Sequence, residues 1–167
     1  AAQVRLVDRT LRALPDILTG RCRATDVIFP DASMALVEGI YQRNPVADFF
    51  NEVLAEVVIT YIREWRKRRG DSSGGLRILE IGAGTGGTSA MIFAKLQEGT
   101  PPYRDCVAEY CYTDISPAFL THAEREYAAG NPYLTTRLFN VEAAITDQRI
   151  AAGTYDLVIA ANVLHAT

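Results

Sequence analysis

Three closely spaced glycines follow a short apolar run and are the first residues of the chain that could do chemistry. Gly82, Gly84 and Gly87 fit the pattern G-x-G-x-x-G. In that pattern glycine permits a tight turn from a strand into a helix and lets a ligand approach the backbone closely. The pattern by itself is compatible with a nicotinamide dinucleotide, with S-adenosylmethionine, or with a purely structural turn. The neighbouring residues must therefore decide which ligand is expected.

Glu80 is the residue that distinguishes between the two cofactors. Its carboxylate stands two residues before Gly82, beside the loop where a dinucleotide would place its pyrophosphate, and like charges repel there. S-adenosylmethionine has no phosphate, and it carries a sulfonium and an α-ammonium that an acid attracts. The charge therefore favours the methyl donor, and a nicotinamide-dependent reductase is the less favoured alternative.

Asp114 is a second acidic candidate, at the end of the apolar run 107–113. An acid at the end of a second strand is placed to accept hydrogen bonds from ribose hydroxyls. It lies farther from Gly82 than the roughly 20 residues of the compact fingerprint, an excess that we attribute to the loop 98–105. Alternatively, Asp114 could cap the following helix, a role for which Ser116 competes.

Alternating strands and helices must position these residues. Short apolar runs predict strands, and amphipathic spacing predicts helices between them. The expected strands are 76–81, 107–113, 135–141 and 155–161, and the expected helices between them are 86–95 and 117–129. Alternating strands and helices predict a parallel sheet with right-handed crossovers, and hence a Rossmann-like α/β domain with about four strands in this chain.

The residues before this α/β region read as helical. Apolar side chains recur at helical intervals from Val4 to Leu18, where Pro15 is expected to split the segment into a helix and a separate turn. A longer helix is expected after Pro45. The polar, glycine-rich stretch 71–75 separates the two regions.

Composition and charge restrict the class of protein. With 49% hydrophobic and 22% charged residues, the 167-residue chain is typical of a globular domain. Its net charge of -3 argues against nucleic-acid binding. No apolar run suggests a membrane span or signal peptide, so a cytoplasmic location is expected. Three cysteines without Cys-x-x-Cys spacing suggest neither disulfides nor a zinc site. The basic cluster 63–69 is interpreted as a solvated helix end, with a docking patch as the alternative.

Several longer motifs resemble the C-methyltransferase domain of polyketide synthases, especially those of the bacterial modular type. The motifs are Phe-Pro-Asp at 29–31 with Leu-Val-Glu at 36–38, Asn-Pro-Val-Ala-Asp-Phe-Phe-Asn at 44–51, Leu-Glu-Ile-Gly-Ala-Gly-Thr-Gly-Gly at 79–87, Tyr-Thr-Asp-Ile-Ser at 112–116, and the run 155–167 that ends in Asn-Val-Leu-His-Ala-Thr. The resemblance implies a class I methyltransferase core. On this basis we expect a helical lid subdomain at 1–70, a linker at 71–75, and the N-terminal part of the core at 76–167.

The resemblance also implies a set of cofactor contacts. The residues expected to bind S-adenosylmethionine are Glu80, Gly82, Gly84, Gly86, Asp114, Asn140, Val141 and Asn162. Family members often carry an aspartate where this chain has Asn140, at the position that accepts from the adenine amino group. An amide oxygen can also accept that bond, so weakened rather than abolished binding is expected.

His165 resembles the catalytic histidine of the family, which removes a proton from the α-carbon of a β-ketoacyl thioester on an acyl carrier protein. Imidazole suits this step, since a carbon between two carbonyls is acidic and a base with a pKa near ~6.5 is available at neutral pH. The enolate would then attack the sulfonium methyl. Without the resemblance, a lone histidine after an apolar strand is more often structural.

The chain ends directly after the fourth expected strand, whereas the complete fold needs further strands and the glutamate that pairs with the histidine in this family. We expect a second polypeptide or further residues to complete the domain, with neighbouring synthase domains and the acyl carrier protein as partners. The alternative is a non-catalytic pseudo-methyltransferase module that serves as a structural spacer.

Overall fold

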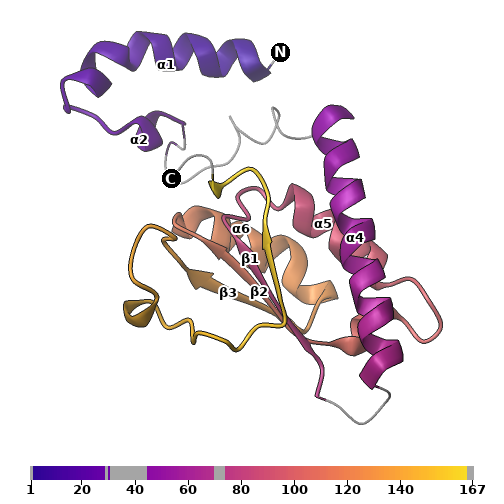
Figure 1. Cartoon of the computed structure of the whole chain (residues 1–167). Helices are drawn as coiled ribbons and strands as arrows, with labels where there is room; N and C mark the ends of the chain where they lie inside the picture. The colour runs from indigo at the N-terminus through magenta and orange to yellow at the C-terminus, as the bar shows by residue number, and fades with distance from the viewer. Residues whose placement is uncertain (1, 29, 31–44, 70–73, 165–167) are drawn as a thin grey trace. The chain divides into compact units, whose positions relative to one another are not determined.

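The computed structural model describes residues 2–28, 30, 45–69 and 74–164. The chain divides into two compact units, Ala1–Asp48 and Phe49–Thr167. Figure 1 shows the ribbon with most of its helices and strands labelled. Each unit is described by itself below.

The described residues 2–28 of the first unit form the helices α1 (Ala2–Leu18) and α2 (Ala24–Ile28). The prediction that Pro15 splits the first segment is wrong, because α1 runs through Pro15 to Leu18. The carbonyl of Pro15 still accepts a bond from the Thr19 amide at 3.2 Å. A proline near the end of a helix removes one donor, and the turn that follows keeps its own hydrogen bonds.

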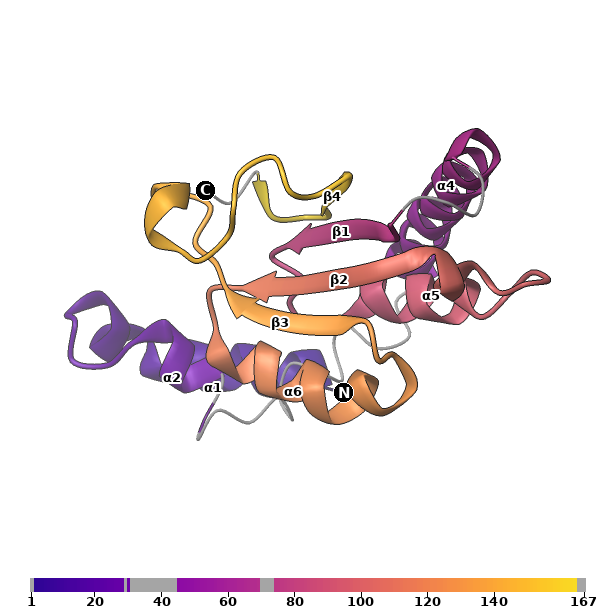
Figure 2. The ribbon, with the colours of Figure 1, turned by 90° about the horizontal axis from the view of Figure 1, so that it is seen from below.

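The second unit is built on a four-stranded sheet whose strands are β1 (Leu76–Ile81), β2 (Val107–Asp114), β3 (Leu134–Leu138) and β4 (Leu157–Ala160). All neighbouring strands are parallel, and their order is β3-β2-β1-β4, as Figure 2 shows. The predicted parallel α/β sheet is confirmed. After β3 the chain returns past β2 to the other side of β1, so the strand order reverses at the carboxyl end of β1, where open α/β sheets bind ligands.

Three helices pack on one face of this sheet: α4 (Pro45–Arg69), α5 (Gly87–Leu96) and α6 (Pro117–Tyr127). Alternate strand residues such as Ile78 and Tyr110 meet Ile62 of α4 and Ile92 of α5 in the larger core cluster. Leu120 of α6 packs with Tyr112. The long helix α4 therefore packs with the sheet.

The opposite face is covered by an irregular segment. Leu79 and Cys111, whose side chains alternate with those of the helix-covered face, form a second cluster with Phe139 and Ile150. Short 3-10 turns complete the unit: η3 (Tyr103–Cys106), η4 (Ala128–Gly130) and η5 (Ile145–Asp147). The residues between β3 and β4 therefore form one wall of the fold as well as a connection.

In the part of the chain that the structure describes, no helix has both the length and the apolar character required to cross a bilayer.

Candidate functional site

The glycine loop joins β1 to α5 in the predicted strand–turn–helix arrangement. Gly82, Gly84 and Gly86 all have left-handed backbones, with φ of 62°, 59° and 78°, a conformation that costs other residues strain. A Cβ on Gly82 would lie 2.3 Å from Cγ2 of Val163, and one on Gly86 would lie 2.7 Å from Cε2 of Tyr127. Both the backbone conformation and the packing therefore require glycine at these two positions.

The end of β2 holds both polar groups of Gly84. The Gly84 amide donates to Oδ2 of Asp114 at 3.0 Å, and its carbonyl accepts from the Tyr112 hydroxyl at 2.7 Å. Burial raises the pKa of Tyr112 far above its ordinary value, so the hydroxyl stays a donor. The neighbouring Ala83 amide donates to the Thr113 carbonyl at 2.9 Å. The loop conformation is thus set by a clamp that consists of Tyr112, Thr113 and Asp114.

Asp114 combines the two roles that its sequence position suggested as alternatives. One carboxylate oxygen accepts from Gly84, and the other accepts from the Ser116 amide at 2.8 Å just before α6. The residue is only 6% exposed. Each carboxylate oxygen can accept a second hydrogen bond, so contact with ribose hydroxyls stays a prediction.

Glu80 has different surroundings from those that the sequence suggested. Its side chain is 1% exposed, and Oε2 accepts from the hydroxyls of Ser89 at 2.5 Å and Tyr110 at 2.6 Å. Burial is the largest influence and raises the pKa of Glu80, against the opposing effect of these two hydrogen bonds. The carboxyl therefore ties β1, β2 and α5 together behind the loop, and its charge is not presented at the loop surface.

The end of β3 carries the two residues expected at the adenine. The side-chain oxygen of Asn140 accepts from the Glu142 amide at 3.0 Å, and one lone pair of that oxygen remains for a ligand. The Asn140 backbone is bonded to the side chain of Gln148. Val141 packs partly against the second core cluster.

The segment after β4 approaches the glycine loop. Asn162 has a left-handed backbone with φ of 53°, and Val163 fills the space beside Gly82. The described residues of the expected site are thus brought to the carboxyl ends of all four strands. His165 lies outside the described residues, so its side chain is not placed.

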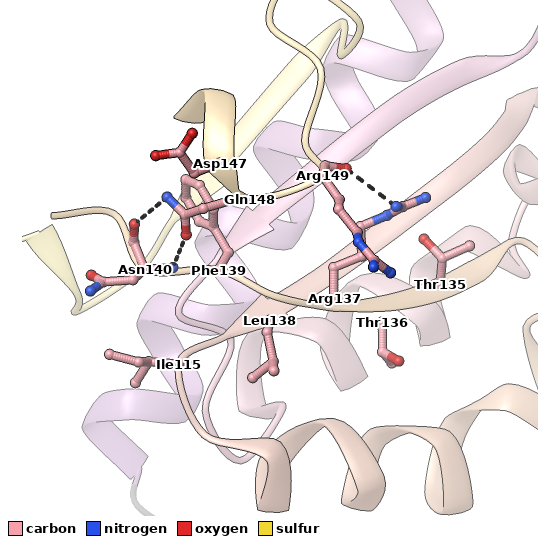
Figure 3. Close-up of a pocket in the computed structure, with 10 residues that line it drawn as sticks. All are labelled: Ile115, Thr135, Thr136, Arg137, Leu138, Phe139, Asn140, Asp147, Gln148 and Arg149. Carbon is pink, nitrogen blue, oxygen red and sulfur yellow. Dashed lines mark hydrogen bonds between the residues drawn. The ribbon is translucent and has the colours of Figure 1, made fainter. Parts of the chain in front are cut away.

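A cavity of about 790 Å³ opens beside the end of β3 (Figure 3). Its lining comes from the residue after β2, from β3 with the two residues after it, and from the turn around η5. It consists of Ile115, Thr135, Thr136, Arg137, Leu138, Phe139, Asn140, Asp147, Gln148 and Arg149. Ile115 directly follows Asp114, and its side chain is 67% exposed. Sequence reasoning did not select Ile115 or Gln148. An apolar residue immediately after a strand-end acid was the available signal for Ile115.

Comparison with known proteins places these features in context. Residues 79–167 match a family model described as a methyltransferase domain. Polyketide synthase PksM of Bacillus subtilis (strain 168) is 59% identical over 166 residues, which are 99% of this chain and 4% of that protein. The chain thus spans a small part of this curated relative.

Solved structures show the same similarity. The DszA carbon methyltransferase matches with a TM-score of 0.77 and 36% identity, over 100% of this chain and 41% of that one. The trans-methyltransferase CalH, solved in complex with SAH, matches with a TM-score of 0.67 and 33% identity over 99% of this chain and 41% of that chain. The sheet and its helices therefore match class I methyltransferase structures, and the chain belongs to the family of methyltransferase domains.

Proposed function

We propose that this chain binds S-adenosylmethionine at the carboxyl edge of its sheet and takes part in methylating the α-carbon of a β-ketoacyl thioester on an acyl carrier protein. The observation that carries the proposal is the left-handed glycine loop clamped to the end of β2 through Asp114 and Tyr112. A structural relative with the same fold was solved with SAH, which supports the choice of cofactor.

The loop amides supply an argument for S-adenosylmethionine that does not depend on the charge of Glu80. The amides of Ala83, Gly84 and Gly86 donate to Thr113, Asp114 and Ala83, respectively. Dinucleotide sites use amides of this loop to bind pyrophosphate. Three loop amides that are bonded internally leave fewer donors for a pyrophosphate, which favours a ligand without phosphate over the nicotinamide dinucleotide of a reductase.

The other expected residues would each contact a different part of the ligand along the carboxyl edge of the sheet. The free lone pairs of Asp114 would accept from the ribose hydroxyls. The exposed side chain of Ile115 offers an apolar surface for the adenine ring. Asn140 would accept from the adenine amino group and Val141 would pack against the base, while Gly82, Gly86 and Asn162 would surround the methionine end.

For the chemical step, His165 is the proposed base. It would take a proton from the carbon between the ketone and the thioester. The enolate carbon would then bond to the sulfonium methyl as the sulfur–methyl bond breaks, leaving S-adenosylhomocysteine. The position of Val163 beside Gly82, two residues before His165, supports this role. The carrier protein and the neighbouring synthase domains are inferred as partners because relatives of this chain are polyketide synthases.

Calorimetric titration tests the cofactor. The full protein that carries this sequence should release or absorb heat with both S-adenosylmethionine and S-adenosylhomocysteine, and with neither NAD nor NADP. A folded protein that binds neither sulfur ligand would overturn the proposal.

Mass spectrometry of a β-ketoacyl carrier protein tests the reaction. His165→Gln should abolish the added methyl group while keeping affinity for S-adenosylhomocysteine. His122→Gln is the matched control, since His122 lies on α6 and is the other of the two histidines in the chain. Undiminished methylation by His165→Gln would remove His165 from its proposed role.

A second candidate is a non-catalytic methyltransferase module that serves as a spacer. The observation that favours it is Asn140, which stands in place of an aspartate and already uses its side-chain oxygen locally. The same two measurements separate the candidates, because a spacer transfers no methyl group to any acyl carrier protein even when it binds the cofactor.

A further inference from the structure

The loop after β3 is held by the side-chain amide of one distant glutamine. Gln148 Oε1 accepts from the Asn140 amide at 2.6 Å, and Nε2 donates to the Asn140 carbonyl at 2.9 Å. Figure 3 shows these two bonds. The same Nε2 lies 3.0 Å from the carbonyl of Ala143 and 3.1 Å from that of Ala144. All four contacts converge on the segment 140–144.

These bonds replace a strand neighbour. β3 ends at Leu138, and without Gln148 the backbone amide of Asn140 would need water or another strand. A primary amide carries the same donor and acceptor as a peptide group, so Gln148 pairs with Asn140 as a neighbouring strand would. The turn that follows is local: Ala143 donates to the Asn140 carbonyl at 3.1 Å, and Glu142 donates to the Asn140 side chain.

Gln148 is itself fixed from the sheet. Ile150, two residues later, is 5% exposed and packs with Leu79 and Cys111. Arg149 adopts a left-handed backbone with φ of 56°, and its carbonyl accepts from Nη1 of Arg137 on β3 at 3.3 Å. A left-handed arginine is unfavourable unless its surroundings impose it. The turn at 147–150 thus brings Gln148 beside the Asn140 loop.

We infer that Gln148 is a positioning residue that sets both affinity and base selectivity at the adenine end of the cofactor site. The inference rests on the proposed function, which puts the adenine at Asn140 and Val141. Gln148 holds the backbone that carries the Asn140 acceptor in one conformation before the ligand arrives, and the Glu142 amide on the same segment holds the side-chain oxygen. Without Gln148, binding must order the segment 140–144 as well, and that cost lowers affinity.

The test compares Gln148→Met with Gln97→Met in the full protein. Methionine keeps the length of the side chain and removes its hydrogen bonds. Gln97 is the matched control because its amide bonds Phe93 and Arg104 near the end of α5. Calorimetry measures S-adenosylhomocysteine and S-inosylhomocysteine, whose base has a carbonyl where adenine has its amino group.

We expect Gln148→Met to lower the affinity for S-adenosylhomocysteine about tenfold. The affinity for S-inosylhomocysteine should fall much less, so that the selectivity between the two ligands falls. Amide hydrogen exchange of the ligand-free protein should accelerate at Asn140 and Ala143 and stay unchanged at Gly84. Gln97→Met should leave both affinities unchanged.

Three outcomes would overturn the inference. Gln148→Met could bind both ligands as the wild type does, even with faster exchange at Asn140. It could lose affinity for both ligands equally, which would indicate a general structural defect. A wild-type protein that binds neither ligand would instead overturn the proposed function, and the inference with it.

Discussion

The two loops that frame the candidate site are held in different ways. The glycine loop is bonded through its backbone to the adjacent strand end, by Asp114 and Tyr112, and is packed against Val163. The loop after β3 is bonded to one side chain, Gln148, from a turn beyond it. The first arrangement depends on several buried neighbours, and the second depends on a single half-buried amide. We therefore expect substitutions around the first loop to affect folding and binding together, whereas substitutions around the second affect binding more than folding.

The largest effect is expected from Gly82→Ala. The added Cβ would lie 2.3 Å from Cγ2 of Val163, on a backbone with φ of +62°. The free energy of unfolding should fall by about 3 kcal/mol, from overpacking together with backbone strain. Urea denaturation measures this loss, and titration should show no remaining heat with S-adenosylhomocysteine.

Gly153→Ala separates the two causes. Gly153 also has a left-handed backbone, with φ of +71°, but a Cβ there would have no neighbour within 4 Å. It should lose only the backbone part, about 1 kcal/mol. Equal losses in the two variants would show that packing against Val163 does not fix the loop.

Asp114→Asn comes next in size. The amide has one oxygen where the carboxylate has two, so its NH₂ group must face the backbone amide of either Gly84 or Ser116. Unfolding should become easier by about 2 kcal/mol, with loss of cofactor affinity. Asp156→Asn is the control, because one oxygen of Asp156 accepts from the Arg77 amide and asparagine can preserve that bond. A loss at Asp114 no larger than at Asp156 would contradict the clamp.

Tyr112→Phe removes only the hydroxyl that donates to Gly84. Stability should fall by about 1 kcal/mol, and affinity for S-adenosylhomocysteine should fall several-fold. Tyr133→Phe removes a comparable bond, from the Tyr133 hydroxyl to Asn131 at 2.6 Å, just before β3 begins. We expect both variants to lose stability and only Tyr112→Phe to lose affinity, which would show that the Tyr112 hydroxyl shapes the glycine loop as well as stabilising the fold. An unchanged affinity in Tyr112→Phe would argue against it.

The smallest effect at neutral pH is expected from Glu80→Gln, and its sign depends on pH. Burial raises the pKa of Glu80 in the folded state above the ordinary 4.5, so the folded protein holds this proton more tightly than the unfolded chain does. The contribution of Glu80 to the free energy of unfolding is therefore fully present below pH 4.5 and is lost as the pH rises through the folded-state pKa. Denaturation between pH 5 and pH 8 should show Glu80→Gln gaining stability relative to the wild type as the pH rises.

The same variant tests the charge argument made from the sequence. S-adenosylmethionine is a sulfonium, and S-adenosylhomocysteine has a neutral sulfur. If Glu80 acts from behind the loop only as a tie between β1, β2 and α5, the ratio of the two affinities should not change in Glu80→Gln. A loss of affinity for S-adenosylmethionine alone would instead support an electrostatic attraction between Glu80 and the sulfonium.

Local patterns predicted the parts of the molecule that local physics determines. The glycines between an apolar run and a helix predicted the loop, and alternating elements predicted the parallel sheet that the structure confirms. The prediction made from Pro15 was wrong, because a proline near a helix end destabilises the helix less than a proline at its centre does. Glu80 was expected beside the loop, and its contact with the cofactor stays a prediction. Sequence gives the position of a charge along the strand and not the hydroxyls that surround it. Gln148 left no sequence signal, since its importance comes from where the turn at 147–150 brings it.

The internal bonding of the glycine loop has a consequence for competition inside a cell. Adenine occurs there mainly in phosphorylated metabolites, which could bind competitively to any site that recognises the base and ribose alone. With the amides of Ala83, Gly84 and Gly86 already engaged, a phosphate that approaches these three groups would have to break bonds of the fold to gain its own. Part of the discrimination against such competitors would then be a property of the empty protein, in place before any ligand arrives.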